Sequence, residues 1–432
     1  MRKKGGAGKK KKTKQPQAVW LPGRDKVEDG EALQYDPSVY DCMSNMSLDW
    51  PCLSFDLLRD HLGGPRSAFP HTLFMVAGTQ ASSAKLNYLG IMKVSNLTQG
   101  KHGQKAAEDS DNDGMSDSDE EEAEPAQLHL RKVSHMGGVN RVRACPQQQH
   151  VVATWGDNAQ VQVWDLSQQL AELKDEAAPS SKDQGRLLKA APRQAHSHSA
   201  EGYALDWSPV AAGRLASGDC RSRIHVWEPG AAGKWAVSAA YKGHEGSVED
   251  LQWSPTEETV FASSSVDQTI RIWDTREKAR SMLTVKAADS DVNVISWNRS
   301  TTYMLASGAD DGGLRVWDLR NFADGSFVAN LTYHRGPVTS VEWSPYEASM
   351  LATTSADNQL AVWDLALERD PEEEAALAPE TNALAPENLP PQLLFVHGGQ
   401  ADPKEAHWHP QIHGLLVSTG ADGFNIFKPY NV

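Results

Sequence analysis

The segment that decides the fold is GHEGSVEDLQWSPTEETVFASSSVDQTIRIWD, residues 243–274. It begins with Gly-His, has a tryptophan before a Ser-Pro turn, and closes with a run rich in β-branched residues that ends in Trp-Asp. Ten of the 14 tryptophans in this chain of 432 residues occupy one of these two places. The early tryptophan recurs at Trp207, Trp253, Trp297 and Trp343, in steps of 46, 44 and 46 residues. A period of this length indicates a chain built from repeated structural units.

The repeated unit resembles the WD40 repeat, which supplies one four-stranded blade of a β-propeller. Each unit alternates short strands with turn residues, as such a blade requires. Six units can be recognised, at about 135–166, 198–229, 243–274, 287–319, 333–365 and 396–429. They leave the ring one blade short of the common seven.

The missing blade is expected upstream of the first unit, in residues 51–133, without a Trp-Asp signature. Four stretches there are expected to form strands in sequence order: 51–58, 72–78, 88–95 and 128–133. The prediction is therefore an all-β fold, a seven-bladed WD40 β-propeller over residues 51–430, with an N-terminal helix and acidic loop insertions. Residues 1–33 are expected to form a basic disordered tail.

Two units contain the full set of side chains that ties one strand connection to the next in WD40 blades. These sets are His244, Ser265, Asp267 and Trp273, and His334, Ser355, Asp357 and Trp363. A His–Asp–Ser set could also be a hydrolase triad, but its recurrence in two blades favours a buried structural network. In the unit 198–229, Arg221 stands where the aspartate is expected, which predicts a weaker network. No nucleophile elbow, phosphate-binding loop or dinucleotide fingerprint accompanies these sets, so we expect neither catalysis nor a cofactor.

Charge is divided unevenly along the chain. The formal net charge is −15, although the first fourteen residues carry eight Lys and Arg and no acidic residue. The rest of the chain is therefore strongly acidic, so it repels nucleic-acid phosphates and favours a basic protein partner. We therefore expect a monomer that binds a basic protein client and does not bind nucleic acid directly. The tail is interpreted as an import signal for the nucleus and nucleolus, with rRNA contact or a solubilising role as alternatives; its lysines are Lys9, Lys10, Lys11, Lys12 and Lys14.

Other features point to an intracellular protein without disulfides or membrane segments. The four cysteines lie far apart and form no Cys-x-x-Cys pair. No apolar run is long enough to span a bilayer or to act as a signal peptide. The histidines of HWHPQIH, His407, His409 and His413, have no nearby carboxylate or cysteine in the sequence, so no metal site is expected.

The stretch before the propeller is expected to form a helix over residues 34–50. Asp36 and Pro37 provide an N-cap and a first-turn proline. Val39, Tyr40 and Met43 fall on one stripe of that helix. Before the last unit, an acidic and proline-rich insertion is expected at 367–391.

The helix followed by LDWPCLS, and the insertion that closes with PPQLLFVHGG, resemble the histone-binding propellers of the retinoblastoma-binding and chromatin-assembly group. In that group the helix and a Pro-Pro loop form a groove on the side of the propeller that receives a histone helix. The resemblance implies a client-binding groove at Val39, Tyr40, Met43, Glu372, Glu373, Glu374, Pro390 and Pro391. The alternative is that the apolar stripe only packs the helix onto the propeller.

A closer resemblance is to the glutamate-rich WD-repeat family. It rests on VWLPGR at 19–24, PCLSFDLLRDHLG at 51–63, AGTQ at 77–80 and an acidic block between N-terminal strands. It implies a nucleolar factor in large ribosomal subunit assembly, a chaperone that escorts newly made large ribosomal subunit protein three. Nothing in composition or spacing points to that particular client.

The acidic block lies in an insertion, 100–126, that is expected to be disordered. Its ten carboxylates could neutralise the basic extension of a ribosomal protein in place of rRNA phosphates. These predicted client-binding residues are Glu108, Asp109, Asp111, Asp113, Asp117, Asp119, Glu120, Glu121, Glu122 and Glu124. Three serines among them, Ser110, Ser116 and Ser118, fit the pattern of acidophilic kinases, and phosphorylation would add negative charge.

Residues 109–120 also match the calcium-loop template D-x-D-x-D-G-x-x-D-x-x-E at every liganding position. A working calcium hand needs flanking helices and usually an apolar residue at position eight, which is Ser116 here. The flanks are polar, contain Gly103 and Pro125, and are not accompanied by a second loop. The block is therefore interpreted as a tethered polyanion.

A third functional class is suggested by IWDTR at 272–276 and VWDLR at 316–320. Both match the Trp-Asp-x-Arg ending of propellers that dock on cullin-RING ligase adaptors. The ending is short and common among blades, so a structural origin is favoured. A chaperone for a basic ribosomal protein is preferred over a histone chaperone and over a substrate receptor of a ubiquitin ligase.

Overall fold

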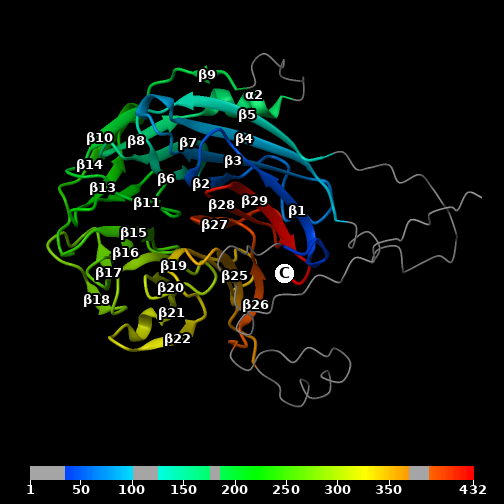
Figure 1. Ribbon diagram of the computed structural model, residues 1–432. Coiled ribbons are helices and arrows are strands. Elements are labelled where there is room, and N and C mark those ends of the chain that lie inside the picture. The colour runs from blue at the N-terminus through cyan, green and yellow to red at the C-terminus, as the bar shows by residue number, and fades with distance from the viewer. Residues whose placement is uncertain (1–34, 101–124, 176–184, 369–388) are drawn as a thin grey trace, which may run out of the picture. The chain divides into compact units, whose positions relative to one another are not determined.

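The computed structural model describes residues 35–100, 125–175, 185–368 and 389–432. The described residues between 35 and 368, together with 390–432, form one compact unit. Within it, strands form seven sheets that follow one another in a ring (Figure 1), and residues of all seven sheets or the turns next to them line one central channel. The prediction of an all-β, seven-bladed propeller is confirmed.

The first four blades each begin with the innermost strand and continue outward. Blade 1 contains β2 (Cys52–Leu58), β3 (His71–Thr79), β4 (Tyr88–Leu97), β5 (Gln127–Ser134) and the short parallel β9 (Leu187–Leu188). Blade 2 contains β6 (Val139–Cys145), β7 (Gln148–Gly156), β8 (Gln160–Asp165) and β10 (Gln194–Ser197). Blade 3 contains β11 (Ala204–Trp207), β12 (Leu215–Gly218), β13 (Ile224–Pro229) and β14 (Trp235–Val237). Blade 4 contains β15 (Val248–Trp253), β16 (Val260–Ser265), β17 (Thr269–Asp274) and β18 (Leu283–Lys286).

The remaining blades complete the ring. Blade 5 contains β19 (Val292–Trp297), β20 (Met304–Ala309), β21 (Gly313–Asp318) and β22 (Phe327–Thr332). Blade 6 contains β23 (Val338–Trp343), β24 (Met350–Ser355), β25 (Gln359–Asp364) and β26 (Leu393–His397). Blade 7 contains β27 (Glu405–Trp408), β28 (Leu416–Gly420), β29 (Gly423–Pro429) and β1 (Tyr40–Met46). Among the described residues, the helical pieces are α2 (Ser167–Lys174) and the 3-10 turns η1 (Pro37–Val39), η2 (Ala84–Leu86), η3 (Ala231–Gly233) and η4 (Leu319–Asn321).

The expected helix over residues 34–50 is wrong. Asp36 does cap a helical turn, since its Oδ1 accepts a hydrogen bond from the Ser38 N–H at 2.9 Å, but only η1 follows. From Tyr40 the chain continues as β1, antiparallel to β29, with Met43 opposite Phe427. The edge of β29 offers a full ladder of backbone hydrogen bonds, and pairing with it closes the ring. Tertiary pairing therefore overrides the local helix signal.

Each Trp-Asp tryptophan is fixed by a hydroxyl ten residues before it in the chain. The indole Nε1–H donates to that hydroxyl oxygen at 2.8–3.0 Å in blades 2 to 6. The pairs are Trp164 with Thr154, Trp227 with Ser217, Trp273 with Ser263, Trp317 with Ser307, and Trp363 with Thr353. All five indoles are buried. The repeat is thus visible as one recurring hydrogen bond in the core of each of these blades.

The serines expected in the two structural sets are therefore corrected. In blade 4, the His244 Nε2 lies 2.6 Å from the Oγ of Ser263, and not at Ser265. Trp273 faces Phe261 across the ladder, so Ser265 lies four residues away, roughly 13 Å along the strand. In blade 6, Thr353 takes this place at 2.8 Å from His334, and Ser355 instead donates to the backbone oxygen of Gly336.

The aspartates of both sets do contact their histidines. The Nδ1 of His244 lies 2.8 Å from Asp267, and that of His334 lies 3.1 Å from Asp357. The weaker network expected from Arg221 does not occur, because Asp219, two residues earlier, lies 3.2 Å from the Nδ1 of His198. The side chains form buried chains of hydrogen bonds that link strands within a blade, as a structural network requires.

Neighbouring blades approach most closely at glycines in the second strand. A Cβ at Gly78, Gly218 or Gly308 would lie within 2.7 Å of the side chain of the first valine in the next innermost strand. Those valines are Val139, Val248 and Val338. A larger residue would push the two blades apart, which explains why these strand positions lack a side chain.

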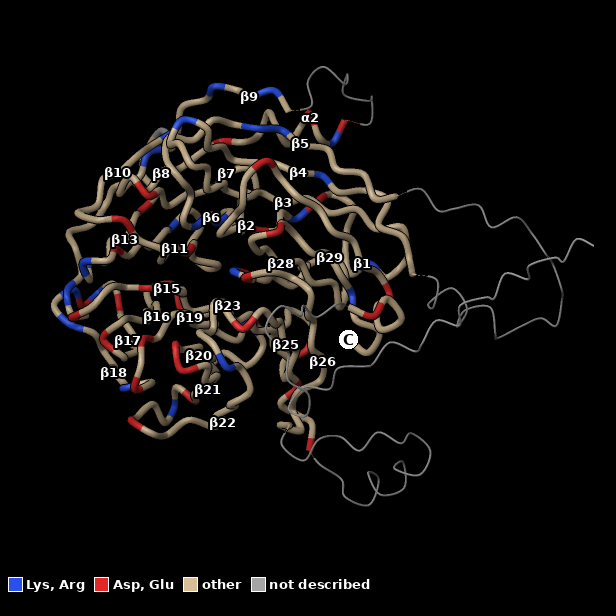
Figure 2. The backbone as a smooth tube through the Cα atoms, viewed as in Figure 1, with Lys and Arg blue, Asp and Glu red and all other residues tan. Residues whose placement is uncertain are grey.

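Charged residues of both signs are distributed over the blades. Lys and Arg are interspersed with Asp and Glu along the described strands and their connections (Figure 2). The strongest concentrations of one sign in the sequence, residues 1–14 and 108–124, lie outside the described residues. Within the described propeller, charge is therefore best considered site by site.

Candidate functional site

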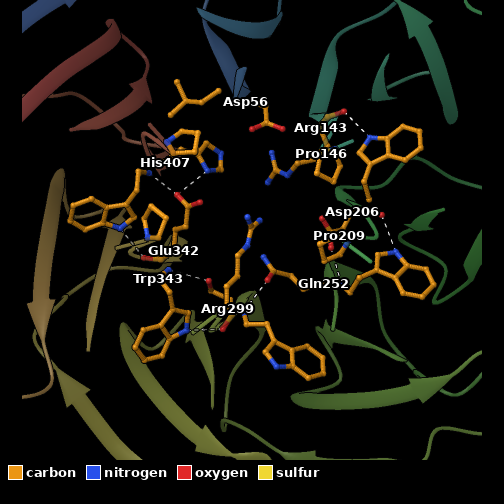
Figure 3. A pocket seen from close by; sticks show the side chains of 18 of the residues that line it. Asp56, Arg143, Pro146, Asp206, Pro209, Gln252, Arg299, Glu342, Trp343 and His407 are labelled. Atoms are coloured by element: carbon orange, nitrogen blue, oxygen red, sulfur yellow. Dashed lines mark hydrogen bonds and ion pairs between the residues drawn. The ribbon is translucent and has the colours of Figure 1, made fainter. Parts of the chain in front are cut away.

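The innermost strands of all seven blades end at one mouth of the central channel, around a cavity of about 190 Å³ (Figure 3). Each strand is followed there by the turn that leads to the second strand of its blade. We call these strand ends and turns the channel mouth. Because every blade contributes an equivalent position, the mouth can be compared blade by blade.

Side chains of the mouth are used first to join neighbouring blades. At five positions, a side-chain oxygen accepts a hydrogen bond from a backbone N–H of the next innermost strand. The pairs are Asp56–Ala144 (2.7 Å), Asp206–Trp253 (2.7 Å), Gln252–Trp297 (2.9 Å), Ser296–Trp343 (3.3 Å) and Glu342–Trp408 (2.8 Å). This part of the lining therefore joins neighbouring blades and stabilises the ring.

The two other equivalent positions, Arg143 and His407, converge on Glu405. Arg143 contacts the Glu405 carboxylate at 2.6 Å, Arg141 contacts it at 2.8 Å, and the Nε2 of His407 lies 3.5 Å away. The Nδ1 of His407 lies 3.1 Å from Glu342. A buried acid is thus surrounded by three groups that can carry positive charge.

The pKa values of this cluster follow from burial and from these neighbours. Burial would raise the pKa of Glu405, but Arg143, His407 and Arg141 hold it well below its usual range. Burial would lower the pKa of His407, but Glu342 and Glu405 raise it to about 10. Histidine and acid are therefore both charged at neutral pH, and the cluster is an ion network with little remaining charge.

Two other carboxyls of the lining behave differently. Burial raises the pKa of Asp206 to about 7, and burial also raises the pKa of Asp250. Arg143 and Arg299 act against burial at Asp206, and Arg141 and Arg143 act against it at Asp250. The mouth therefore becomes more positive as pH falls through the neutral range.

The rim of the mouth is a ring of seven equivalent residues. Each lies two positions after the early tryptophan of its blade, or after the residue that replaces this tryptophan in blades 1 and 2, Leu57 and Ala144. Arg59 of blade 1 and Arg299 of blade 5 are its only charged members among these seven. The five other blades have proline there: Pro146, Pro209, Pro255, Pro345 and Pro410. Sequence reasoning missed this ring, although Trp-Asn-Arg in place of Trp-Ser-Pro at 297–299 was its visible signal.

The turn that carries Arg299 is held in one shape. The Oδ1 of Asn298 accepts hydrogen bonds from the N–H groups of Ser300 (2.9 Å) and Thr301 (2.8 Å), and its Nδ2 donates to Ala348 of the next blade. Arg299 is exposed and extends toward the middle of the mouth (Figure 3). No described residue forms a hydrogen bond or an ion pair with its side chain.

The structure separates the residues of the predicted groove. Val39 is 41% exposed, whereas Tyr40 is only 3% exposed and donates or accepts a hydrogen bond with the Nδ1 of His397 at 2.7 Å. The Tyr40 ring also packs edge-on against Phe395 and Phe427. Tyr40 belongs to the core of blade 7, so the prediction that it contacts a client directly is wrong.

Other predicted groove residues lie near one another at the propeller side. Tyr430 donates its N–H to the oxygen of Val39, and Asn431 donates to the oxygen of Leu394, close after Pro391. Met43 and Pro390 are partly buried, and Pro391 is exposed. The start of β1 and the start of β26 therefore share one surface, on which Val39 and Tyr430 are exposed.

Several predicted sites lie outside the described residues. These are the ten acidic residues from Glu108 to Glu124, the three serines among them, Glu372 to Glu374, and the lysines from Lys9 to Lys14. The match to a calcium loop lies there too. What the structure does fix is where these segments leave the propeller, because β4, β5, β25 and β26 are described.

The two arginines of the Trp-Asp-x-Arg endings fold back onto their own aspartates. Arg276 contacts Asp274 at 2.5 Å, and Arg320 contacts Asp318 at 2.6 Å. The Arg320 guanidinium also stacks on the Tyr303 ring at 3.7 Å. Both arginine side chains remain mostly exposed, at 75% and 64%.

No metal centre is formed within the described part of the chain, where no three His, Cys, Asp or Glu side chains are placed to share an ion. His407 pairs with acids of the mouth, and His409 accepts a hydrogen bond from the Gln411 N–H at 3.0 Å. In the same residues, no helix has the length and apolar character needed to cross a membrane.

Comparison with known proteins gives two family models. The model for the histone-binding protein RBBP4 and its counterpart in the CAF1 complex matches residues 30–98, which include β1 to β4. The model "WD domain, G-beta repeat" matches residues 235–274, 280–318 and 325–364. Among solved structures, the WD40 β-propeller domain of Doa1 aligns with 90% of this chain and 96% of its own, with a TM-score of 0.57 and 12% identity. That likeness shows the fold alone.

Three relatives match over almost their full length. The chain is 50% identical to Protein HEAT STRESS TOLERANT DWD 1 of Arabidopsis thaliana, covering 96% of this chain and 92% of the relative. It is 49% identical to Glutamate-rich WD repeat-containing protein 1 of Dictyostelium discoideum, covering 97% and 86%. It is 40% identical to Ribosome assembly protein rrb1 of Schizosaccharomyces pombe, covering 96% and 85%. The motifs, the seven blades and these matches agree that the chain belongs to the glutamate-rich WD-repeat family.

Proposed function

We propose that this protein is a non-catalytic assembly factor of the large ribosomal subunit, a chaperone that holds a newly made basic ribosomal protein. The observation that carries the proposal is the 40% identity, over 96% of the chain, to a relative named as a ribosome assembly protein. By family resemblance the client is large ribosomal subunit protein three. The proposed place of action is the nucleus and its nucleolus.

The positions of the acidic insertions support this function. The segment from Glu108 to Glu124 joins β4 to β5 in blade 1, and the segment with Glu372 to Glu374 joins β25 to β26 in blade 6. Blades 1 and 6 are the two neighbours of blade 7, where β1 closes the ring. Each insertion links a third strand to a fourth strand, so both begin at the end of the propeller that carries the channel mouth. Two acidic segments thus start on either side of the surface that carries Val39 and Tyr430.

This placement suits a client with a basic extension and an apolar anchor. Each exposed ion pair contributes little alone and is screened by salt, so many carboxylates must act together. Val39 and Tyr430 offer exposed apolar contacts. Number of charges and one anchor together can shield a basic segment from unwanted RNA.

The test is to purify the protein from growing cells at moderate salt and identify its stoichiometric partner. A large-subunit ribosomal protein supports the proposal. Core histones would replace it with the histone-chaperone alternative, which the match of residues 30–98 to the histone-binding model favours. A cullin-RING adaptor would replace it with the ligase-receptor alternative suggested by Arg276 and Arg320.

A second experiment measures how the acidic segments contribute. In one variant the ten carboxylates from Glu108 to Glu124 become amides at unchanged length, and in a matched variant Glu372, Glu373 and Glu374 become glutamines. Client affinity is measured from about 50 mM to about 500 mM salt, a range over which the Debye length shortens and exposed charges are increasingly screened. The first variant is expected to bind weakly with little salt dependence. An unchanged salt slope would show that these carboxylates do not hold the client.

The tail is tested separately. Replacing Lys9, Lys10, Lys11, Lys12 and Lys14 with alanine in a fluorescent fusion is expected to leave the protein in the cytoplasm. Unchanged nuclear signal would assign import to another part of the chain.

A further inference from the structure

The channel mouth contains charged groups that the propeller itself does not use. Asp56, Asp206, Gln252, Ser296 and Glu342 bind backbone N–H groups of the next blade, and Arg141, Arg143 and His407 bind Glu405. These side chains are committed to joining blades. Arg59 and Arg299, on the rim, have no such role.

The two rim arginines are exceptions to a repeated rule. Five blades have a proline at this position, and only blades 1 and 5 have an arginine. Counted around the ring, blade 5 is three blades from blade 1 in one direction and four in the other, so the arginines stand nearly opposite each other across the mouth. For neither side chain does a described residue supply a carboxylate partner. Two uncommitted guanidinium groups therefore face one opening.

The groups around the arginines restrict what can bind. The prolines give the rim apolar rings and remove the backbone N–H donors at these five positions, because proline has no N–H. Beneath the rim, Glu342 is paired with His407, and burial raises the pKa of Asp56, Asp206 and Asp250. The lining therefore adds little charge to that of the two arginines, which match an anion that carries about two negative charges better than a chain of many phosphates. A cavity of about 190 Å³ holds one or two side chains and not a folded domain. An anion of low charge, carried on an extended and partly apolar chain, fits these conditions best.

We propose that the channel mouth binds an extended acidic segment of a protein partner, with carboxylates paired to Arg59 and Arg299. Arginine suits this role because its planar fork can hold a carboxylate through two parallel hydrogen bonds. The partner would lie across the proline rim and place its carboxylates toward the two arginines. This site differs in chemistry from the proposed site for a basic client, so the protein could hold an acidic and a basic segment together.

The probe is an array of fluorescein-labelled ten-residue peptides, each with two glutamates in a Gly-Ser-Leu background and one to six residues between them. Binding to the full chain is measured by fluorescence anisotropy at about 150 mM salt, near physiological ionic strength, beside peptides in which both glutamates are glutamine. The chain with amides from 108 to 124 is measured in parallel, so that its own acidic segment cannot mask the site. At least one glutamate spacing is expected to bind about tenfold more tightly than its glutamine partner, the effect of one charge-assisted contact.

Variants then identify the site. Arg59→Ala and Arg299→Ala are each expected to weaken the preferred peptide about tenfold, and Arg299→Lys to weaken it less. The matched control is Arg335→Ala, an exposed arginine that precedes β23 and so lies at the opposite end of the channel. Thermal melting checks that each variant keeps the fold.

The possible outcomes are decisive. Absence of glutamate preference in both forms of the chain overturns the proposal, as does an equal loss in Arg299→Ala and Arg335→Ala. Tighter and Arg299-dependent binding of a phosphoserine peptide or of a ten-nucleotide RNA would assign the mouth to phosphate instead. Binding of the basic client is measured in the same variants; it is expected to persist, which separates a failure here from a failure of the assembly function.

Discussion

At the residue scale, the core of each of blades 2 to 6 depends on one hydroxyl. In blade 4, Ser263 accepts a hydrogen bond from the Trp273 indole at 2.8 Å and lies 2.6 Å from His244, which in turn contacts Asp267. When the Nδ1–H of His244 donates to Asp267, the Nε2 of His244 is an acceptor, and the Ser263 hydroxyl donates to it. One small side chain thus completes a chain of four groups, three of them buried.

Ser263→Ala is therefore expected to destabilise the protein by about 2–3 kcal/mol, because two buried nitrogens lose their partner. Ser265→Ala is the matched control, since its hydroxyl accepts the N–H of Asp267 at 3.1 Å and has no part in the tryptophan–histidine network. It is expected to cost about 1 kcal/mol or less. Denaturant midpoints of the two variants give the comparison. Equal losses would mean that Ser263 does not hold the network.

A pH effect is expected from His407. Glu342 and Glu405 raise its pKa to about 10 from an ordinary value of 6.5. A raised folded pKa contributes stability that is fully present below pH 6.5 and is lost as pH rises toward 10. The melting temperature of the wild type should fall between about pH 7 and about pH 9. That of His407→Gln should be lower at neutral pH and should change little over the same range. Parallel curves would contradict the assignment of this ion network.

At the element scale, β1 decides whether the ring closes. It is the strand that sequence reasoning took for a helix, since Asp36-Pro37 and a stripe of Val39, Tyr40 and Met43 satisfy helical rules. Alternate residues Tyr40 and Cys42 are buried, which is the two-residue period of a strand. A stretch this short fits both periods, and only the free edge of β29 decides between them. That edge lies near the other end of the chain and cannot be seen locally.

Tyr40→Ala is expected to cost about 3–5 kcal/mol, as large-to-small changes of buried aromatic residues do. Tyr40→Phe keeps the ring contacts with Phe395 and Phe427 but loses the hydrogen bond to His397, at a cost of about 1–2 kcal/mol. Val39→Ala, on the exposed neighbour, should stay within about 0.5 kcal/mol. Chemical denaturation measures all three, and client binding is compared only among variants that remain folded. A folded Val39→Ala variant with weaker client binding would support the proposed apolar anchor.

At the scale of the whole molecule, the arrangement of blades could be predicted far better than their detailed contacts. The spacing of Trp207, Trp253, Trp297 and Trp343 reports the repeat directly, because each tryptophan occupies the same place in its blade. The serine of the network could not be chosen in this way, since Ser263 and Ser265 lie on the same face of one strand. The rim ring was missed because its arginines come from blades far apart in sequence. The two arginines lie at the same channel mouth only after the ring has closed.

Contacts between blades should be as sensitive as those within them. Gly308→Ala would place a Cβ 2.4 Å from the Cγ1 of Val338 in the next blade. The overlap is expected to cost about 1–3 kcal/mol. Adding Val338→Ala should restore part of this loss by making room for the new methyl group. Melting temperatures of the two single variants and the double variant test this, and simple additivity of the two losses would contradict a steric origin.

The pairing of β1 with β29 also has a mechanical consequence. Tyr40, at the start of β1, lies opposite Pro429, at the end of β29, and no other described strand pairs with β1. A pull on the chain ahead of Tyr40 therefore loads the ladder from that end, perpendicular to the strands, so that its hydrogen bonds break one pair after another instead of all at once. Under tension from the N-terminal side, β1 is expected to separate from β29 while the other six blades are still folded. An unfolding enzyme that pulls on the basic N-terminal tail is therefore expected to open the ring first at the pairing of β1 with β29.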